Sequence, residues 1–185
     1  MGFKKPVILA NGTTKHAVDV RKGDVLSNGS RVTCAVAIKA PEEGLEMVQL
    51  KGGLWITPYH PVRAHQAASS VVTASGWTSK AAEWVFPIEA GAMRVEVNRA
   101  DLPLIYSFVL EGEAQWLSID GVDVVAMGHG LIDNAVVAHE FFASAIVEQL
   151  SLLEGYAEGS VVVGGWVRDP TTMRVVGLEA CSASW

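Results

Sequence analysis

The sequence predicts a mostly β protein, and three observations carry this prediction. Tight-turn signals crowd the N-terminal region, where Asn11-Gly12, Gly23-Asp24 and Asn28-Gly29 separate short apolar runs. Alternating apolar residues return between residues 104 and 126. One segment, residues 138–153, instead repeats its apolar residues every three or four positions, as an amphipathic helix does.

The first half of the chain is expected to consist of strands joined by hairpins. Asn11-Gly12 and Asn28-Gly29 tolerate positive φ, so each can close a hairpin between its flanking runs. Pro58 and Pro61 stiffen the turn after the last of these runs. The expected strands cover residues 7–9, 14–20, 24–26, 31–38, 46–50 and 54–56.

The second half is expected to add strands, one helix and a closing hairpin or two. The helix of residues 138–153 should rest its apolar face on the β core, and Gly155 is placed to stop it. Residues 179–185 carry no pattern and are expected to form a tail. The expected strands cover residues 104–110, 115–119, 122–126, 161–163, 166–168 and 174–177.

Composition limits the number of domains and the kinds of partner. A chain of 185 residues with 50% hydrophobic content can bury one sizeable core, so we expect a single domain over residues 1–178 and a monomer. A net charge of −6 without charged blocks disfavours nucleic acid. No membrane span or signal peptide is recognised, which slightly favours the cytoplasm. Cys34 is expected to be a buried free thiol.

The segment around Thr57 and His60 is the first candidate for chemistry. A buried strand at residues 54–56 delivers both side chains onto the stiff turn. A threonine hydroxyl and an imidazole can together hydrogen-bond a carbonyl and pass a proton to a departing amine. The plainer interpretation is that His60 is a turn residue bonded to a neighbouring carbonyl.

Eight segments follow one another in a specific order: residues 3–13, 18–24, 54–62, 106–110, 119–122, 126–130, 137–142 and 165–170. In this order they resemble the Hint fold shared by inteins and the hedgehog autoprocessing domain, and most closely its Vint branch, found in proteins that also carry a von Willebrand factor A module. The resemblance spans roughly residues 2–178 and implies a curled, horseshoe-shaped β fold.

The resemblance implies a self-cleaving domain. Hint domains resemble one another in using an N-terminal Cys or Ser to attack the preceding carbonyl, which gives a (thio)ester. Here Gly2 stands at that nucleophile position, as an inactivating substitution, a natural loss or a vector-derived residue. Thr57 and His60 match the residues that polarise the scissile peptide and protonate its amine.

Other positions also differ from the family pattern. The C-terminal His-Asn of inteins is missing, so complete splicing is not expected. Ser107 stands where an acidic residue or Asn is frequent. His129 lies near the place of the C-terminal His, and between two glycines it is a candidate base for thioester hydrolysis or a turn residue. His139 is expected to pack or to cap the helix.

Two function classes stay open. The first is an autoprocessing domain that cleaves the bond before its own first residue, with an upstream module, a von Willebrand factor A module as the candidate, as its partner. The second is a non-catalytic β-rich module of a larger protein, which Gly2 favours for the chain as written. Neither needs a cofactor, and a zinc site from His60, His129 and His139 matches no metal-binding spacing.

Overall fold

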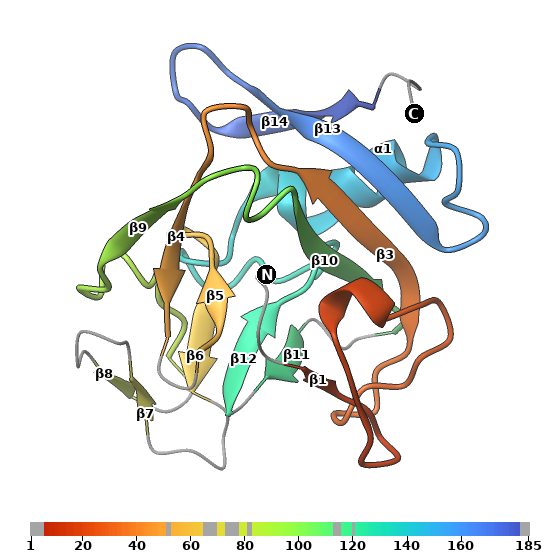
Figure 1. Cartoon of the computed structure of the whole chain (residues 1–185), viewed down its shortest axis with the longest axis horizontal. Coiled ribbons are helices and arrows are strands. Elements are labelled where there is room, and N and C mark those ends of the chain that lie inside the picture. Colours follow the sequence, from red (N-terminus) through yellow and green to blue (C-terminus); the bar gives the residue numbers. More distant parts are fainter. Residues whose placement is uncertain are drawn as a thin grey trace.

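The computed structural model describes residues 6–50, 53–64, 70–72, 78–80, 83–112, 116–119 and 121–181. Within these residues β strands dominate, and a short helical segment lies beside the largest sheet (Figure 1). The mostly β class predicted from the sequence is confirmed.

The largest sheet has four strands in the order β10 (Leu104–Leu110), β3 (Val32–Lys39), β13 (Ser160–Arg168) and β14 (Val175–Ala180). β13 runs parallel to β3, with Val161 opposite Val36, whereas the other neighbours are antiparallel. Apolar clusters cover both faces of β3, since Ala35 belongs to one cluster and its neighbours Cys34 and Val36 belong to another. Burial on both faces explains why β3 reads as a nearly continuous apolar run.

Two three-stranded sheets meet at the turn that carries Thr57 and His60. One has the order β5 (Trp55–Ile56), β4 (Leu45–Gln49), β9 (Arg94–Val97), and the other β11 (Trp116–Ile119), β12 (Val122–Val125), β6 (Val62–Ala64). Because β5 ends before this turn and β6 begins after it, residues 57–61 link the two sheets (Figure 1).

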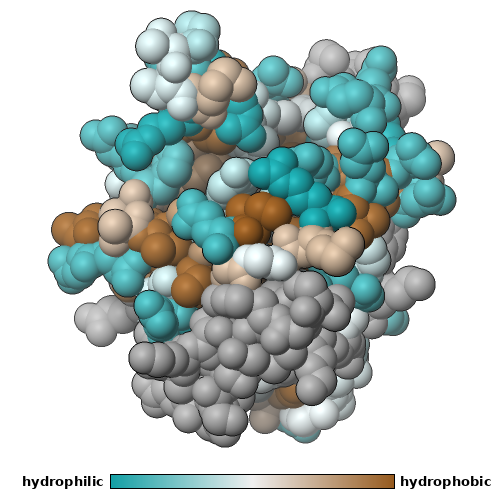
Figure 2. Space-filling model, turned by 90° about the vertical axis from the view of Figure 1, so that its left-hand side faces the viewer, coloured by the Kyte–Doolittle hydropathy of each residue, from teal (hydrophilic) through white to brown (hydrophobic). Residues whose placement is uncertain are grey.

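The edge strand β9 is exposed and charged. Val95 is 40% exposed, and the guanidinium of Arg94 lies 2.8 Å from the carboxylate of Glu46 on β4. Charges on an edge strand discourage pairing with other chains. Figure 2 views this side of the molecule and shows hydrophobic and hydrophilic residues interspersed.

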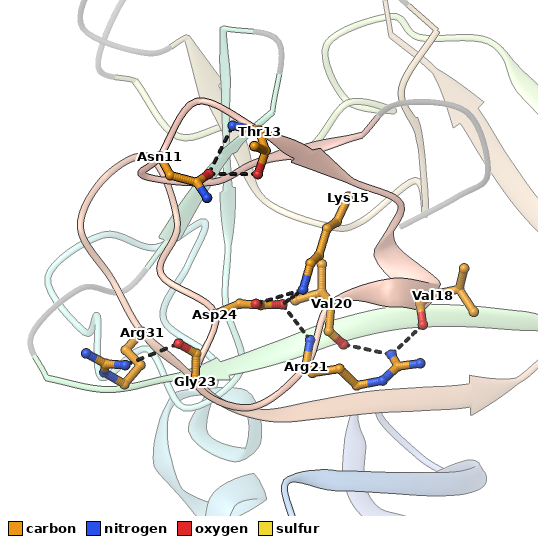
Figure 3. A network of polar contacts seen from close by, with 9 residues as sticks. All are labelled: Asn11, Thr13, Lys15, Val18, Val20, Arg21, Gly23, Asp24 and Arg31. Carbon is orange, nitrogen blue, oxygen red and sulfur yellow. Dashed lines mark hydrogen bonds and ion pairs between the residues drawn. The ribbon is translucent and has the colours of Figure 1, made fainter.

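The N-terminal hairpin is fixed by side-chain oxygens. β1 (Val7–Ile8) pairs with β2 (Thr14–Lys15), and Asn11 Oδ1 accepts bonds from the N–H and hydroxyl of Thr13 (Figure 3). Asp24 accepts from Lys15 Nζ at 2.8 Å and from the N–H of Arg21 at 2.9 Å, so one carboxylate ties the hairpin to the next turn. Of the strand expected over residues 14–20, only β2 forms, and the short helix η1 (Ala17–Asp19) follows it. β1 lies beside β11.

The remaining strands, β7 (Ser70–Val72) and β8 (Thr78–Lys80), form a two-stranded sheet of their own. Among the residues that the structure describes, no helix is long and apolar enough to cross a membrane.

The expected helix exists but is shorter than residues 138–153. It consists of a π-helical turn, η2 (Phe141–Ala145), followed by α1 (Ile146–Ser151). Its buried residues are Phe141, Ala143, Ile146 and Leu150, which face the sheet as the apolar pattern predicted. Leu152, expected inside the helix, is its C-cap and is 85% exposed, whereas the next residue, Leu153, packs against the core cluster.

The C-terminal strands form a single hairpin, β13–β14. Gly164 and Gly165, expected near its turn, lie inside β13 at a register shift. A Cβ on Gly164 would lie 3.2 Å and 3.3 Å from the main-chain oxygens of Glu179 and Ala180, so the backbone of β14 leaves little room for a larger residue there. β14 extends through Ala180, and the first two residues of the expected tail are therefore strand.

Candidate functional site

The Thr57–His60 turn is held by the main chain. The N–H of His60 donates to the Thr57 carbonyl at 3.1 Å, and Val62 exchanges main-chain bonds with Val85 at 2.9 and 3.0 Å. The ladder between β6 and β12 pairs Val62 with Val124. The turn therefore leads directly into a strand that is anchored on both sides, which fixes the direction of the imidazole.

The side chain of His60 is hydrogen-bonded to the end of β12. Its Nε2 lies 3.0 Å from the main-chain oxygen of Val125. A carbonyl oxygen only accepts, so Nε2 carries the proton and Nδ1 carries the lone pair. The plainer expectation of a carbonyl partner is thus met, and the same bond leaves a basic nitrogen for chemistry.

The surroundings of His60 keep it neutral at physiological pH. The pKa of His60 is lowered to about 4; burial is the main cause and the charge of His129 contributes, whereas the bond to Val125 acts in the opposite direction. A neutral imidazole with a defined tautomer can accept a proton on Nδ1 and return it, as a proton relay requires.

His129 is buried, with 4% of its surface exposed. Its Nδ1 accepts the N–H of Leu131 at 3.0 Å, so Nε2 carries the proton. Burial lowers the pKa of His129 to about 4, and the charge of His139 contributes to the shift. The charge of His129 acts on the pKa of His60, and the charge of His139 acts on the pKa of His129.

The two glycines beside His129 are required by the backbone conformation. Gly128 and Gly130 have φ values of 72° and 63°, and a Cβ on Gly128 would overlap Val147. Their N–H groups donate to the Phe142 and Ala143 carbonyls at 3.0 Å. The helix start therefore holds the segment that carries His129.

Comparison with models of known protein families identifies the family of this chain. The sequence model of the Vint family, described as a Hint domain, matches residues 2–177. The chain belongs to the Vint family of Hint domains. No curated protein matches the sequence. The membership confirms the resemblance seen in the sequence and, in general terms, supports an autoprocessing type of Hint fold.

The expected site residues of this Vint domain differ in how deeply they are buried. His129 is buried, whereas His60 is half-buried, as is Thr57 at the start of the same turn. Gly2, the expected nucleophile position, lies outside the described residues. Ser107 is 4% exposed, and its hydroxyl has no hydrogen-bond partner among the described residues.

His139 lies against the helix, as expected. Its ring centre is 4.9 Å from that of Phe142, and its Nδ1 makes a long contact of 3.5 Å with the Phe142 N–H. Among the parts of the chain that the structure describes, no group of three or more His, Cys, Asp or Glu side chains could hold a metal ion.

Sequence reasoning missed two contributors to the Vint site. One is the Val125 carbonyl, since a main-chain atom leaves no sign in the sequence. The other is the buried ion pair between Arg63 and Asp123, whose Nε and Oδ2 lie 3.1 Å apart. An aspartate inside the apolar run of residues 122–125 was the available signal, because a buried carboxylate needs a partner.

Proposed function

We propose that this Vint domain is built for autoprocessing by an N-to-S acyl shift at residue 2, without complete splicing. In the chain as written, Gly2 offers no nucleophile, so the reaction is disarmed. With a cysteine there, Sγ would bond to the preceding carbonyl carbon, and the bond from that carbon to the nitrogen of residue 2 would break.

The observation that carries this proposal is the proton arrangement of His60. With Nε2–H engaged by the Val125 oxygen at 3.0 Å, only Nδ1 is basic. Nδ1 would take the proton of the attacking thiol and return it to the departing amine, so one atom serves both halves of the shift. The His60 pKa of about 4 supports this order of proton transfers. The imidazole is neutral at the start, and once protonated it is a strong acid towards the departing amine.

Two further residues would support the acyl shift. Thr57, at the start of the same turn, would hydrogen-bond the carbonyl under attack. His129 presents an Nε2–H, because its Nδ1 lone pair is occupied by the Leu131 N–H. In this arrangement it would donate to the thioester oxygen while water attacks; to act as a base it would first have to release Leu131.

The substrate of the reaction is the same polypeptide. An upstream module, with a von Willebrand factor A module as the candidate, would be released at the bond before residue 2. The resemblance to the Vint branch motivates this partner, and the burial of His129 suits an internal peptide better than a diffusing molecule.

The experiment restores the missing thiol. A folded reporter is fused in place of Met1 before Gly2→Cys, and a small thiol or hydroxylamine is added. We expect time-dependent release of the reporter, followed by gel electrophoresis and intact mass, because a thioester is far more labile than an amide. The parent Gly2 fusion and a Gly2→Ala fusion are the controls and should stay intact. Release from all three, or from none, would contradict the proposal.

Gly2 itself favours the second function, that of a non-catalytic β-rich module. In that case Gly2→Cys would give a folded protein whose reporter is not released by thiol. Far-UV circular dichroism of the fusion separates this result from misfolding.

A further inference from the structure

The side chain of Arg63 lies between two tryptophans. Its guanidinium carbon is 4.5 Å from the ring centre of Trp84 and 4.2 Å from that of Trp116. Trp84 is 6% exposed and Arg63 has a side chain only 14% exposed, so the cation is largely removed from water. A planar guanidinium can stack on aromatic faces on both sides, which an ammonium group cannot do.

The charge of Arg63 is matched by a buried carboxylate. Asp123 is 1% exposed; its Oδ2 lies 3.1 Å from Arg63 Nε, and its Oδ1 accepts the hydroxyl of Ser118. A buried ion pair adds little stability compared with apolar residues of the same volume, and its best-established use is to select one arrangement among several. This pair therefore indicates that a particular alignment of strands matters here.

The same alignment of β6 with β12 determines where the His60 imidazole lies. Arg63 stands directly opposite Asp123 in the β6–β12 ladder, and the ladder continues through Val62–Val124 to the bond between Val125 N–H and the Pro61 carbonyl at 3.4 Å. The next contact along the chain is His60 Nε2 with Val125 O. A shift of the β6–β12 register by one residue would turn Arg63 away from Asp123 and would also move the Val125 carbonyl away from His60.

The tryptophans connect the same alignment to His129. Trp84 and Val125 belong to one buried cluster, against which Trp116 and Leu131 pack, and Leu131 is the residue whose N–H binds His129. Asn28 fixes the other end of Trp116, because its amide donates to the Trp116 carbonyl at 2.6 Å. Val125 and Leu131, whose main-chain atoms bind the two histidines, thus share the cluster into which Arg63 is inserted.

We propose that Arg63, stacked between Trp84 and Trp116 and paired with Asp123, is the positioning residue that holds His60 on the Val125 carbonyl. Its relevance to catalysis rests on the function proposed above, whereas its effect on the His60 hydrogen bond does not. Arg63 touches no reacting atom in this scheme and acts only through His60.

The hydrogen bond can be tested in the chain as it is. With ¹⁵N-labelled histidine, the five histidines give a small spectrum, and His60→Gln identifies the His60 signals. We expect the parent at pH 7 to show the tautomer with the proton on Nε2 and a slowly exchanging Nε2–H. In Arg63→Met that proton should exchange rapidly and the tautomers should mix. Arg63→Lys, which keeps the charge but not the stack, should be intermediate.

The matched control is Arg31→Met, which removes an exposed arginine that also pairs with a carboxylate, that of Glu111. It should leave the His60 spectrum unchanged. If Arg63→Met does not fold, Arg63→Lys decides the question alone. A folded Arg63 variant with the parent tautomer and exchange rate would overturn the proposal.

A second measurement separates this proposal from the proposed function. In the Gly2→Cys fusion, Arg63→Lys should slow thiol-dependent release by on the order of tenfold or more, because a catalytic group misplaced by about 1 Å loses up to a hundredfold. Arg31→Met should not slow it. If the fusion shows no release, the proposed function fails while the spectrum still tests the positioning. If release occurs and Arg63→Lys leaves its rate unchanged, the positioning proposal fails and the function stands.

Discussion

The imidazole Nε2 of His60 lies 3.0 Å from the main-chain oxygen of Val125, a residue 65 positions further along the chain. This bond fixes three properties of His60 together: its direction, its tautomer and its distance from the end of β12. A histidine on a free turn would have none of them fixed.

We expect His60→Ala to slow thiol-dependent release from the Gly2→Cys fusion by on the order of a hundredfold or more, since proton transfer by a positioned side chain contributes that much. Thr57→Ala should slow it less, because it removes one hydroxyl and keeps the main-chain bond from the His60 N–H. The rates are measured by densitometry of reporter release at fixed thiol. Equal rates for His60→Ala and its parent would refute the assigned role.

We expect His129 to act on the resolution of the thioester rather than on its formation. His129→Asn retains an acceptor for the Leu131 N–H but lacks the Nε2–H donor. In the Gly2→Cys fusion it should therefore release the reporter with added thiol at the parent rate, and by water alone more slowly. His129→Ala should show the same pattern with some loss of stability. Parallel slowing of both releases would assign His129 to the first step instead.

Stability should rise with pH between about 4 and 6.5. His60 and His129 have a folded-state pKa of about 4 against an ordinary value of 6.5, so the unfolded chain binds more protons in this window. Their contribution is complete above pH 6.5 and is lost as the pH falls towards 4. A difference of about 2.5 pKa units corresponds to roughly 3 kcal/mol for the buried His129, and to less for His60, which is partly exposed.

Urea unfolding at a series of pH values measures this slope. His129→Asn should flatten it, and His16→Gln, at an exposed histidine, should not. The lowered pKa of Asp24, whose carboxylate pairs with Lys15, adds a further loss only in more acidic solution, so the two effects separate along the pH axis. A flat profile between pH 4 and 6.5 would show that the histidines are not shielded in the folded state.

The helix should be most sensitive at Ile146. This side chain is fully buried, so Ile146→Ala is expected to lower the free energy of unfolding by about 2–5 kcal/mol. Phe142 is half-buried and makes edge contacts with Phe141 and Trp166, with ring centres 5.3 and 5.2 Å apart. Phe142→Ala should therefore have a smaller effect. Thermal unfolding followed by circular dichroism compares the two, and a reversed order would contradict the register of the helix.

Part of this protein could be predicted from the sequence because its signals are local. Asn11-Gly12 and Asn28-Gly29 adopt positive φ at their glycines and close the turns that they predicted, since few other residues reach that conformation. The extent of β10, residues 104–110, matches its apolar run. The ordered motifs from residue 2 onward identified the Vint family, and the family match confirms it.

Only the tertiary structure decided how these pieces produce a site. The parallel pairing of β13 with β3, the inclusion of Gly164 and Gly165 within a strand, and the early end of the helix all depend on contacts between distant segments. The basic nitrogen of His60 is chosen by the carbonyl of Val125, and the burial of Asp123 requires Arg63. Sequence patterns report which residues avoid water and which turns are allowed; hydrogen bonds and pKa values depend on which atoms meet, and folding alone brings those atoms together.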